Sequence, residues 1–195
     1  LAALYASGVD NALIQLDGVE VPILDGSSEM FTQGIEKAGT QALEEDRLFF
    51  KVRKNISFID QERGIEMLIV PIEEDELRLT VMVDYNSPIL STQHARLESL
   101  SKFSKEIASC RTFVFMKEVK SLAEKGLIKG GDVDNAVVLA EKPYSKAELQ
   151  DIAKSLGRDE LGVIDGETGV VSTSKLRFTN EPARHKLLDI LGDLA

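Results

Sequence analysis

The segment from Pro182 to Asp193 separates apolar from ionisable side chains cleanly, and this separation limits how the chain can fold. Residues four apart in sequence share one face of a helix, so His185, Asp189 and Asp193 would form a single stripe. The opposite arc would be apolar, made of Leu187, Leu188, Ile190, Leu191 and Leu194. The pattern predicts an amphipathic helix that packs its apolar arc on a core and lines a site with its ionisable stripe.

The first two members of the stripe, His185 and Asp189, are one helical turn apart and could share a zinc ion, since both are good zinc ligands. Asp193, a turn further on, could hold a neighbouring group in place. A catalytic zinc usually has three protein ligands and a water, so two are too few. The other histidine, His94, is in a polar stretch without metal-ligand spacing and is expected at the surface. The alternative is a solvated helix face that binds nothing.

The chain is acidic, with 23 basic and 33 acidic residues among 195 and a net charge of −10. It has no block rich in lysine and arginine, which argues against nucleic acid as a partner. No stretch approaches the roughly 18 apolar residues of a membrane span, so at most peripheral membrane contact is expected. The single cysteine, Cys110, cannot form an internal disulfide, which fits a reducing cytoplasm. Its apolar surroundings predict a buried, unreactive thiol.

Hydrophobic periodicity predicts strands and helices without regular alternation, which indicates an α+β architecture. Helices are expected at 1–7, 29–43, 97–109, 115–125 and 145–156, in addition to the final segment. Strands are expected at 10–16, 19–24, 48–52, 57–60, 64–71, 76–84, 134–140 and 169–172. Those between 48 and 84 are expected to form one sheet.

Three local signals refine this assignment. Asp17-Gly18 predicts a hairpin turn between the first two strands. Ser145 followed three residues later by Glu148 predicts a capping box at the start of a helix. The acidic run at 44–46 is the best candidate for a linker between domains.

Five short motifs, taken together, resemble one enzyme family. They are Gly8-Val9-Asp10-Asn11, Pro22-Ile23-Leu24-Asp25-Gly26-Ser27, Cys110-Arg111-Thr112-Phe113-Val114-Phe115, Gly130-Gly131-Asp132-Val133-Asp134-Asn135-Ala136 and Arg184-His185-Lys186-x-x-Asp189-x-x-Gly192-Asp193-Leu194. Their order and span, which covers nearly the whole chain, resemble those of UDP-3-O-acyl-N-acetylglucosamine deacetylase, the zinc hydrolase of bacterial lipid A synthesis.

The resemblance implies catalytic and metal-binding roles for four residues. His185 and Asp189 match zinc ligands of the family. Asp193 matches the acid that orients a catalytic histidine further toward the C-terminus. Thr112 matches the hydroxyl that hydrogen-bonds the developing oxyanion, a group whose charge must be stabilised during amide hydrolysis.

Substrate-binding roles and a domain organisation are implied in the same way. Phe113 matches an aromatic that packs on the sugar, and Lys186 matches a basic residue near the substrate phosphate. The implied fold has two similar domains, each a β-sheet packed on a pair of α-helices. Residues 1–46 would end the first domain and 47–195 would form most of the second, with an inserted βαβ unit at about 127–176 that forms an acyl-chain tunnel.

The resemblance also implies that part of the site lies outside this sequence. The family's glutamate base and first zinc histidine are expected just upstream of Leu1, and its catalytic histidine beyond Ala195. The chain is therefore expected to be an inactive fragment of a cytoplasmic enzyme that deacetylates UDP-3-O-acyl-N-acetylglucosamine and releases acetate. The alternative is a non-catalytic scaffold of the same fold that binds nucleotide sugars or lipids.

Some of the matched residues also have a purely structural interpretation. Phe113 and Phe115 alternate as buried strand residues would. Asp25-Gly26-Ser27 is typical of a turn and helix cap. Glu118, in the helix expected at 115–125, could face either the site or solvent.

Overall fold

The computed structural model describes residues 1–87, 90–126, 128, 130–162, 164–165, 168–171 and 175–195. The helices are α1 (Ala2–Ala6), α2 (Glu29–Ala38), α3 (Phe103–Glu106), α4 (Met116–Glu124), α5 (Lys146–Ser155) and α6 (Glu181–Asp193), with a 3-10 turn at Leu100–Lys102. The strands are β1 (Ile56–Asp60), β2 (Ile65–Ile69), β3 (Leu79–Val83), β4 (Gln93–Leu97), β5 (Phe113–Phe115), β6 (Val137–Leu139) and β7 (Val170–Val171). The fold is α+β, as the sequence predicts.

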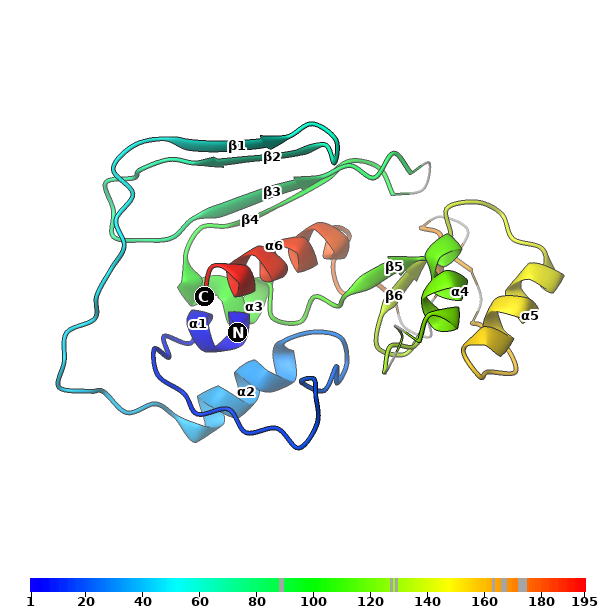
Figure 1. The fold of residues 1–195 in the computed structure, drawn as a ribbon, viewed down its shortest axis with the longest axis horizontal. Coiled ribbons are helices and arrows are strands. Elements are labelled where there is room, and N and C mark those ends of the chain that lie inside the picture. The colour runs from blue at the N-terminus through cyan, green and yellow to red at the C-terminus, as the bar shows by residue number, and fades with distance from the viewer. Residues whose placement is uncertain (88–89, 127, 129, 163, 166–167, 172–174) are drawn as a thin grey trace.

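Helix α6 lies at the centre of the larger part of the molecule, between the β3–β4 pair and α1 (Figure 1). Its Leu187 and Leu191 side chains are fully buried. They pack in one core cluster with Leu97 of β4, with Phe103 of α3 and with Ile107. The apolar arc predicted for this helix is therefore confirmed as buried at Leu187 and Leu191, whereas Ile190 and Leu194 of the same arc are exposed.

The strands within the described ranges form three small sheets. β1 pairs with β2 and β3 with β4, both antiparallel, with Phe58 opposite Met67 and Val81 opposite Ala95. In Figure 1 the β1–β2 pair lies beyond the β3–β4 pair, on the side away from α6. The one sheet expected between 48 and 84 is therefore two separate pairs among the described residues.

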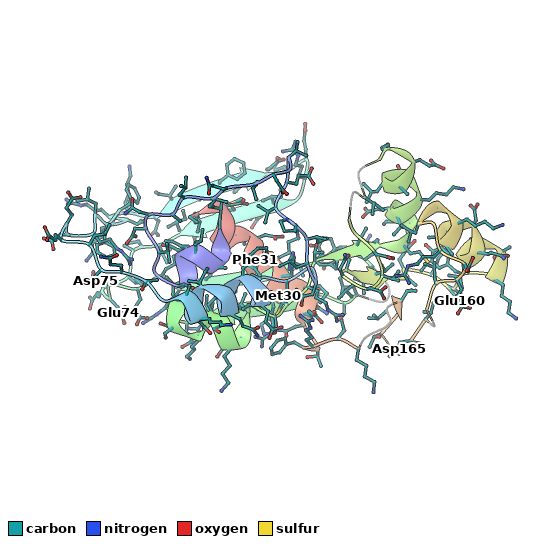
Figure 2. All side chains as sticks on the ribbon, turned by 90° about the horizontal axis from the view of Figure 1, so that it is seen from below. Met30, Phe31, Glu74, Asp75, Glu160 and Asp165 are labelled. Atoms are coloured by element: carbon teal, nitrogen blue, oxygen red, sulfur yellow. The ribbon has the colours of Figure 1, made fainter. Side chains whose placement is uncertain are left out.

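The smaller part of the molecule is built around β5, β6 and β7. β5 pairs parallel to β6, and α4 connects them, so these three elements form a βαβ unit that begins at Phe113. β7 pairs antiparallel to β6. The predicted end of that last strand, Ser172, lies outside the described residues. In Figure 2, Glu74 and Asp75 lie at the far end of the larger part of the molecule, and Glu160 lies at the opposite end, in the smaller part.

The hairpin expected at 10–24 is wrong, because this segment has no strand in the structure. A strand needs a neighbour for its backbone groups and a surface for its apolar face. Here Leu13 is 87% exposed and Val19 is 90% exposed, so their side chains have found no such surface. The expected strand at 48–52 is absent for the same reason, with Phe50 90% exposed.

Other elements also differ from the sequence prediction. α2 ends at Ala38 because Gly39 takes a φ of 75°, which ends the helix before residue 43. β4 was not predicted, yet it alternates well, with Ala95 and Leu97 buried. The helix expected at 97–109 is correspondingly reduced to the 3-10 turn and α3.

The capping box is confirmed at the start of α5. Ser145 Oγ accepts from the backbone N–H of Glu148 at 3.3 Å, and the Glu148 carboxylate accepts from the backbone N–H of Ser145 at 2.8 Å. Among the helices of the described ranges, none combines the length and the apolar character needed to span a bilayer.

Candidate functional site

The ionisable stripe of α6 has the predicted geometry at its first two positions. Nε2 of His185 lies 3.3 Å from Oδ1 of Asp189, one turn further along the helix. Nδ1 of the same ring lies 3.0 Å from the backbone carbonyl oxygen of Cys110. Because a carbonyl oxygen can only accept, Nδ1 carries the proton and donates this hydrogen bond.

This hydrogen bond determines what the other ring nitrogen can do. In the neutral ring Nε2 has a lone pair, and that lone pair faces an oxygen of the Asp189 carboxylate. Two acceptors at this distance need a proton or a cation between them. A histidine held through Nδ1 by a carbonyl, with a carboxylate beside Nε2, is the arrangement that metal-binding histidines adopt. Nε2 of His185 and the carboxylate of Asp189 are therefore suitable as ligands for zinc.

The described ranges supply only these two donors. They contain no group of three or more histidine, cysteine, aspartate or glutamate side chains that could hold a metal ion. Asp193, the third member of the stripe, is exposed at the end of α6. The structure thus brings His185 and Asp189 together and leaves Asp193 beside them.

Lys186 lies at the edge of the same carboxylate. Its Nζ donates to Oδ2 of Asp189 at 2.8 Å and lies 5.7 Å from the ring centroid of Phe113. Burial disfavours the charge of the lysine, but the hydrogen bond and the charge of Asp189 outweigh it, so the pKa of Lys186 is raised. A half-buried cation therefore stands next to an aromatic ring and the two candidate ligands.

Three aromatic rings form a wall beside this cation. The rings of Tyr85, Phe113 and Phe115 pack edge to face. The ring centroid of Tyr85 lies 5.6 Å from that of Phe113 and 5.4 Å from that of Phe115, and the two phenylalanine centroids are 6.3 Å apart. Burial raises the pKa of the Tyr85 hydroxyl, and the charge of Asp189 adds to this rise against the opposing charge of Lys186. Sequence analysis missed Tyr85, which follows β3 without a recognisable motif.

The strand interpretation of Phe113 and Phe115 is confirmed, since both belong to β5. Phe115 is buried, whereas Phe113 is half-buried and also contacts the Lys186 ammonium group. Both backbone groups of Thr112, just before the strand, are bonded. Its N–H donates to the carbonyl of Gly26 at 2.7 Å, and its carbonyl accepts from Val137 at 2.8 Å. These two bonds fix the backbone of Thr112, whose half-buried side chain follows two residues after Cys110, the residue whose carbonyl contacts His185.

The Asp25-Gly26-Ser27 turn supports this strand. Gly26 has a φ of 79°, and a Cβ atom there would come within 1.8 Å of the carbonyl oxygen of Asn135. Asp25 accepts from Arg177 at 2.8 Å. Burial raises the pKa of Asp25, but hydrogen bonds from Ser27 and Arg177 outweigh this and hold it below its usual range. The turn thus has the structural role that its sequence suggests.

The sequence model of the family described as "LpxC: UDP-3-O-acyl N-acetylglycosamine deacetylase" matches residues 1–153 and 147–195. The chain belongs to this deacetylase family. The resemblance carried by the five motifs is thereby confirmed.

Individual relatives of the deacetylase family match the whole chain. It is 43% identical to proteins named bifunctional enzyme LpxC/FabZ from Chlorobaculum tepidum and Porphyromonas gingivalis, and covers 42% and 41% of their lengths. It is 36% identical to the UDP-3-O-acyl-N-acetylglucosamine deacetylase of Leptospira biflexa and covers 55% of it. The chain spans about half the length of the curated relatives it matches.

The remaining residues that the sequence singled out are placed as follows. Cys110 is fully buried, as predicted, and burial raises its pKa to about 12, so its thiol is unreactive at neutral pH. His94 is exposed on β4, again as predicted. Glu118 is exposed on α4. Its negative charge contributes to the raised pKa of Tyr85, so it lies near the three aromatic rings.

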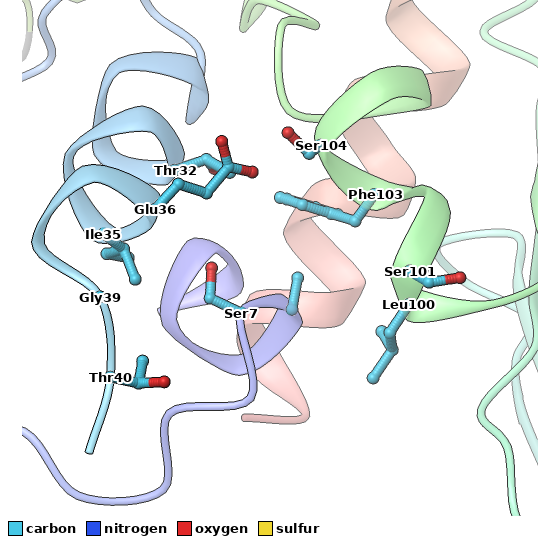
Figure 3. A pocket seen from close by; sticks show the side chains of 11 residues that line it. Ser7, Thr32, Ile35, Glu36, Gly39, Thr40, Leu100, Ser101, Phe103 and Ser104 are labelled. Carbon is cyan, nitrogen blue, oxygen red and sulfur yellow. The ribbon is translucent and has the colours of Figure 1, made fainter.

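A separate cavity of about 280 Å³ lies between α1, α2 and α3 (Figure 3). Hydroxyl side chains, among them Ser7 and Ser104, and the carboxylate of Glu36 line it. The hydroxyl of Thr32, the buried polar group at its wall, already donates to the Ser28 carbonyl at 2.9 Å. No residue of the α6 stripe lines this cavity, so it is distinct from the candidate site of this deacetylase-family chain.

Proposed function

We propose that the protein is a zinc-dependent deacetylase that hydrolyses the N-acetyl group of UDP-3-O-acyl-N-acetylglucosamine and releases acetate, as a step of lipid A synthesis. The observation that carries the proposal is the lone pair of His185 Nε2 aimed at Asp189, with the opposite ring nitrogen fixed by a backbone carbonyl. Membership of the deacetylase family supports the reaction class, and the names of the relatives support the substrate.

His185 and Asp189 would hold the zinc ion. When bound, zinc supplies Lewis acidity that activates water and polarises an amide carbonyl. A catalytic zinc takes three protein ligands, so the proposal requires a further ligand beyond the two that the described residues supply. It likewise requires a general base and a general acid for the proton transfers of amide hydrolysis.

Other side chains of the chain would bind and orient the substrate. The Lys186 ammonium group would bind a phosphate of the UDP moiety, because it is a charged, half-buried donor beside the ligand pair. The Phe113 ring would pack on the sugar. The Thr112 hydroxyl would donate to the oxyanion as it develops, and Asp193 would orient a catalytic histidine.

The test is metal content and acetate release in the whole protein with His185→Ala and Asp189→Ala. We expect each variant to lose bound zinc and to lower kcat/KM by about 100-fold or more, because a ligand is removed. The matched control is His94→Ala, which removes the other histidine from an exposed strand and is expected to change neither quantity. Full zinc content and activity in either ligand variant would contradict the site. Binding of the UDP-sugar by the wild-type protein without acetate release would instead favour the non-catalytic scaffold.

A further inference from the structure

Two buried charged side chains that the proposed reaction does not use join α6 to the segment before β5. Arg111 is 2% exposed and Glu181, the first residue of α6, is 0% exposed. Nε of Arg111 lies 2.9 Å from Oε1 of Glu181, and Nη2 lies 3.2 Å from Oε2. A charge pair this deeply buried needs its remaining acceptor sites filled.

Backbone donors fill those sites. The N–H of Arg111 donates to Oε1 of Glu181 at 3.0 Å, and the N–H of Arg177 donates to Oε2 at 2.7 Å. Each oxygen of the Glu181 carboxylate therefore accepts from at least two donors. The carboxylate is consequently fixed in position at the first turn of α6.

One of these donors leads directly to the candidate metal ligand. The N–H of Arg111 and the carbonyl of Cys110 belong to one peptide group, which is planar and rigid. The N–H end of this peptide donates to Glu181, and its carbonyl end accepts from Nδ1 of His185. Glu181 and His185 are four residues apart on α6, so they share the helix face that this peptide spans.

We propose that Glu181 is a positioning residue that acts on His185 through the peptide group between Cys110 and Arg111. By accepting from the N–H, the carboxylate orients the peptide and polarises its carbonyl, since hydrogen bonds in a chain strengthen one another. The carbonyl then holds a proton of His185 on Nδ1 and turns Nε2 toward Asp189. Arg111 balances the buried charge of the carboxylate.

Only one part of this inference rests on the proposed function, namely that Nε2 binds a metal. The orientation of the ring and the position of its proton are properties of the metal-free protein. A purely structural role for the Arg111–Glu181 pair would stabilise the junction of α6 with β5 without selecting a histidine tautomer. The tautomer therefore separates the two possibilities.

The experiment is a long-range ¹H–¹⁵N spectrum of the whole metal-free protein with labelled histidine at about pH 8, where an exposed imidazole is neutral. His94, which is exposed, provides the internal reference for an unconstrained ring. We expect Nδ1 of wild-type His185 to carry a proton throughout, because the Cys110 carbonyl accepts from it. In the double variant Arg111→Met/Glu181→Leu, which removes both buried charges together so that neither is left uncompensated, the His185 signals should move toward the tautomer mixture of His94.

Two further variants keep the test decisive. Glu181→Gln keeps one acceptor oxygen, so it should produce a smaller shift in the same direction. Ile152→Ala, in α5, removes a buried side chain from a separate core cluster and serves as the control for general destabilisation. An unchanged His185 tautomer in both Glu181 variants, or an equal shift in Ile152→Ala, would overturn the inference.

Zinc affinity supplies the second measurement. The double variant should bind zinc about 10-fold more weakly or worse than wild type, as expected when the hydrogen-bond partner of a metal-binding histidine is removed. If the wild-type protein binds no zinc, the proposed function fails, while the tautomer shift still decides the role of Glu181. If zinc binds and the tautomer does not respond to Glu181, the positioning role fails and the proposed function stands.

Discussion

Two apolar regions of this chain differ greatly in how deeply the fold buries their side chains. At the α6 junction, which comprises α6, residues 109–115 and the turn at 25–27, Leu187 and Leu191 are fully buried, and the buried Arg111 and Glu181 form an ion pair. In the β1–β2 hairpin, residues 56–69, Phe58 is 55% exposed and Met67 is 57% exposed. Both regions follow the periodicity of their secondary structure. The difference shows that periodicity determines the type of element, whereas burial depends on a second surface to pack against.

The largest expected effect comes from truncating one apolar side chain in each region. Leu187→Ala at the α6 junction should lower the free energy of unfolding by about 3–5 kcal/mol, because it leaves a cavity in a fully packed core. Phe58→Ala in the hairpin removes a side chain that is half in solvent and should cost less than about 1 kcal/mol. Urea denaturation of both variants measures the contrast. Equal losses would mean that the hairpin is buried in solution.

A second contrast concerns glycines with positive φ. Gly26→Ala should lower the free energy of unfolding by about 2–4 kcal/mol, since left-handed strain adds to a collision with the Asn135 carbonyl. Gly39 has a φ of 75° and open space where its Cβ would be, so Gly39→Ala should cost only the backbone strain of about 1–2 kcal/mol. Thermal unfolding of the two variants isolates the contact between the 25–27 turn and residue 135. The same loss in both would show that this contact yields easily.

The smallest effect is a pH-dependent one at the edge of the junction. Asp25→Asn should lower the free energy of unfolding by about 1 kcal/mol at neutral pH, because charge-assisted hydrogen bonds to Arg177 and Ser27 are weakened. The pKa of Asp25 is lowered in the folded state. Its stabilisation is therefore present above the ordinary carboxyl pKa and lost as the pH falls through the folded-state value.

The measurement for Asp25 is the difference in unfolding free energy between wild type and Asp25→Asn from about pH 7 down to about pH 3. The difference should shrink toward zero at the acidic end. Asp10→Asn is the matched control, since Asp10 pairs with Arg47 while both side chains are about half exposed. That exposed pair should contribute less than about 0.5 kcal/mol. A constant difference across the pH range for Asp25→Asn would contradict the assigned cause.

Local signals in the sequence predicted local structure well. The α6 stripe, the Ser145–Glu148 capping box and the buried state of Cys110 follow from spacing and immediate context, and the structure has all three. Strand β4 was missed because its outward residues, His94 and Arg96, gave the stretch a polar character. The α6 stripe, the capping box and the buried cysteine could be predicted without knowledge of the fold, because each depends only on residues close together in the sequence.

Features that depend on distant partners were out of reach. The hairpin expected at 10–24 had the right alternation but no surface to cover it. The Arg111–Glu181 pair joins residues 70 positions apart, and charged residues are ordinarily assigned to the surface. The resemblance drew attention to the motif that contains Arg111 but not to Glu181. A buried pair of opposite charges can be recognised only once the chain has brought both together.

The hydrogen bond that orients His185 uses the carbonyl of Cys110, a main-chain atom present whatever residue occupies position 110. Replacing Cys110 with alanine or serine would therefore keep the acceptor, and the side chain there is open to variation within the limits of its buried volume. Position 111 is different, because proline would remove the N–H that donates to Glu181. The orientation of the His185 ring therefore depends on the path of the main chain at residues 110 and 111 more than on which side chain stands at position 110.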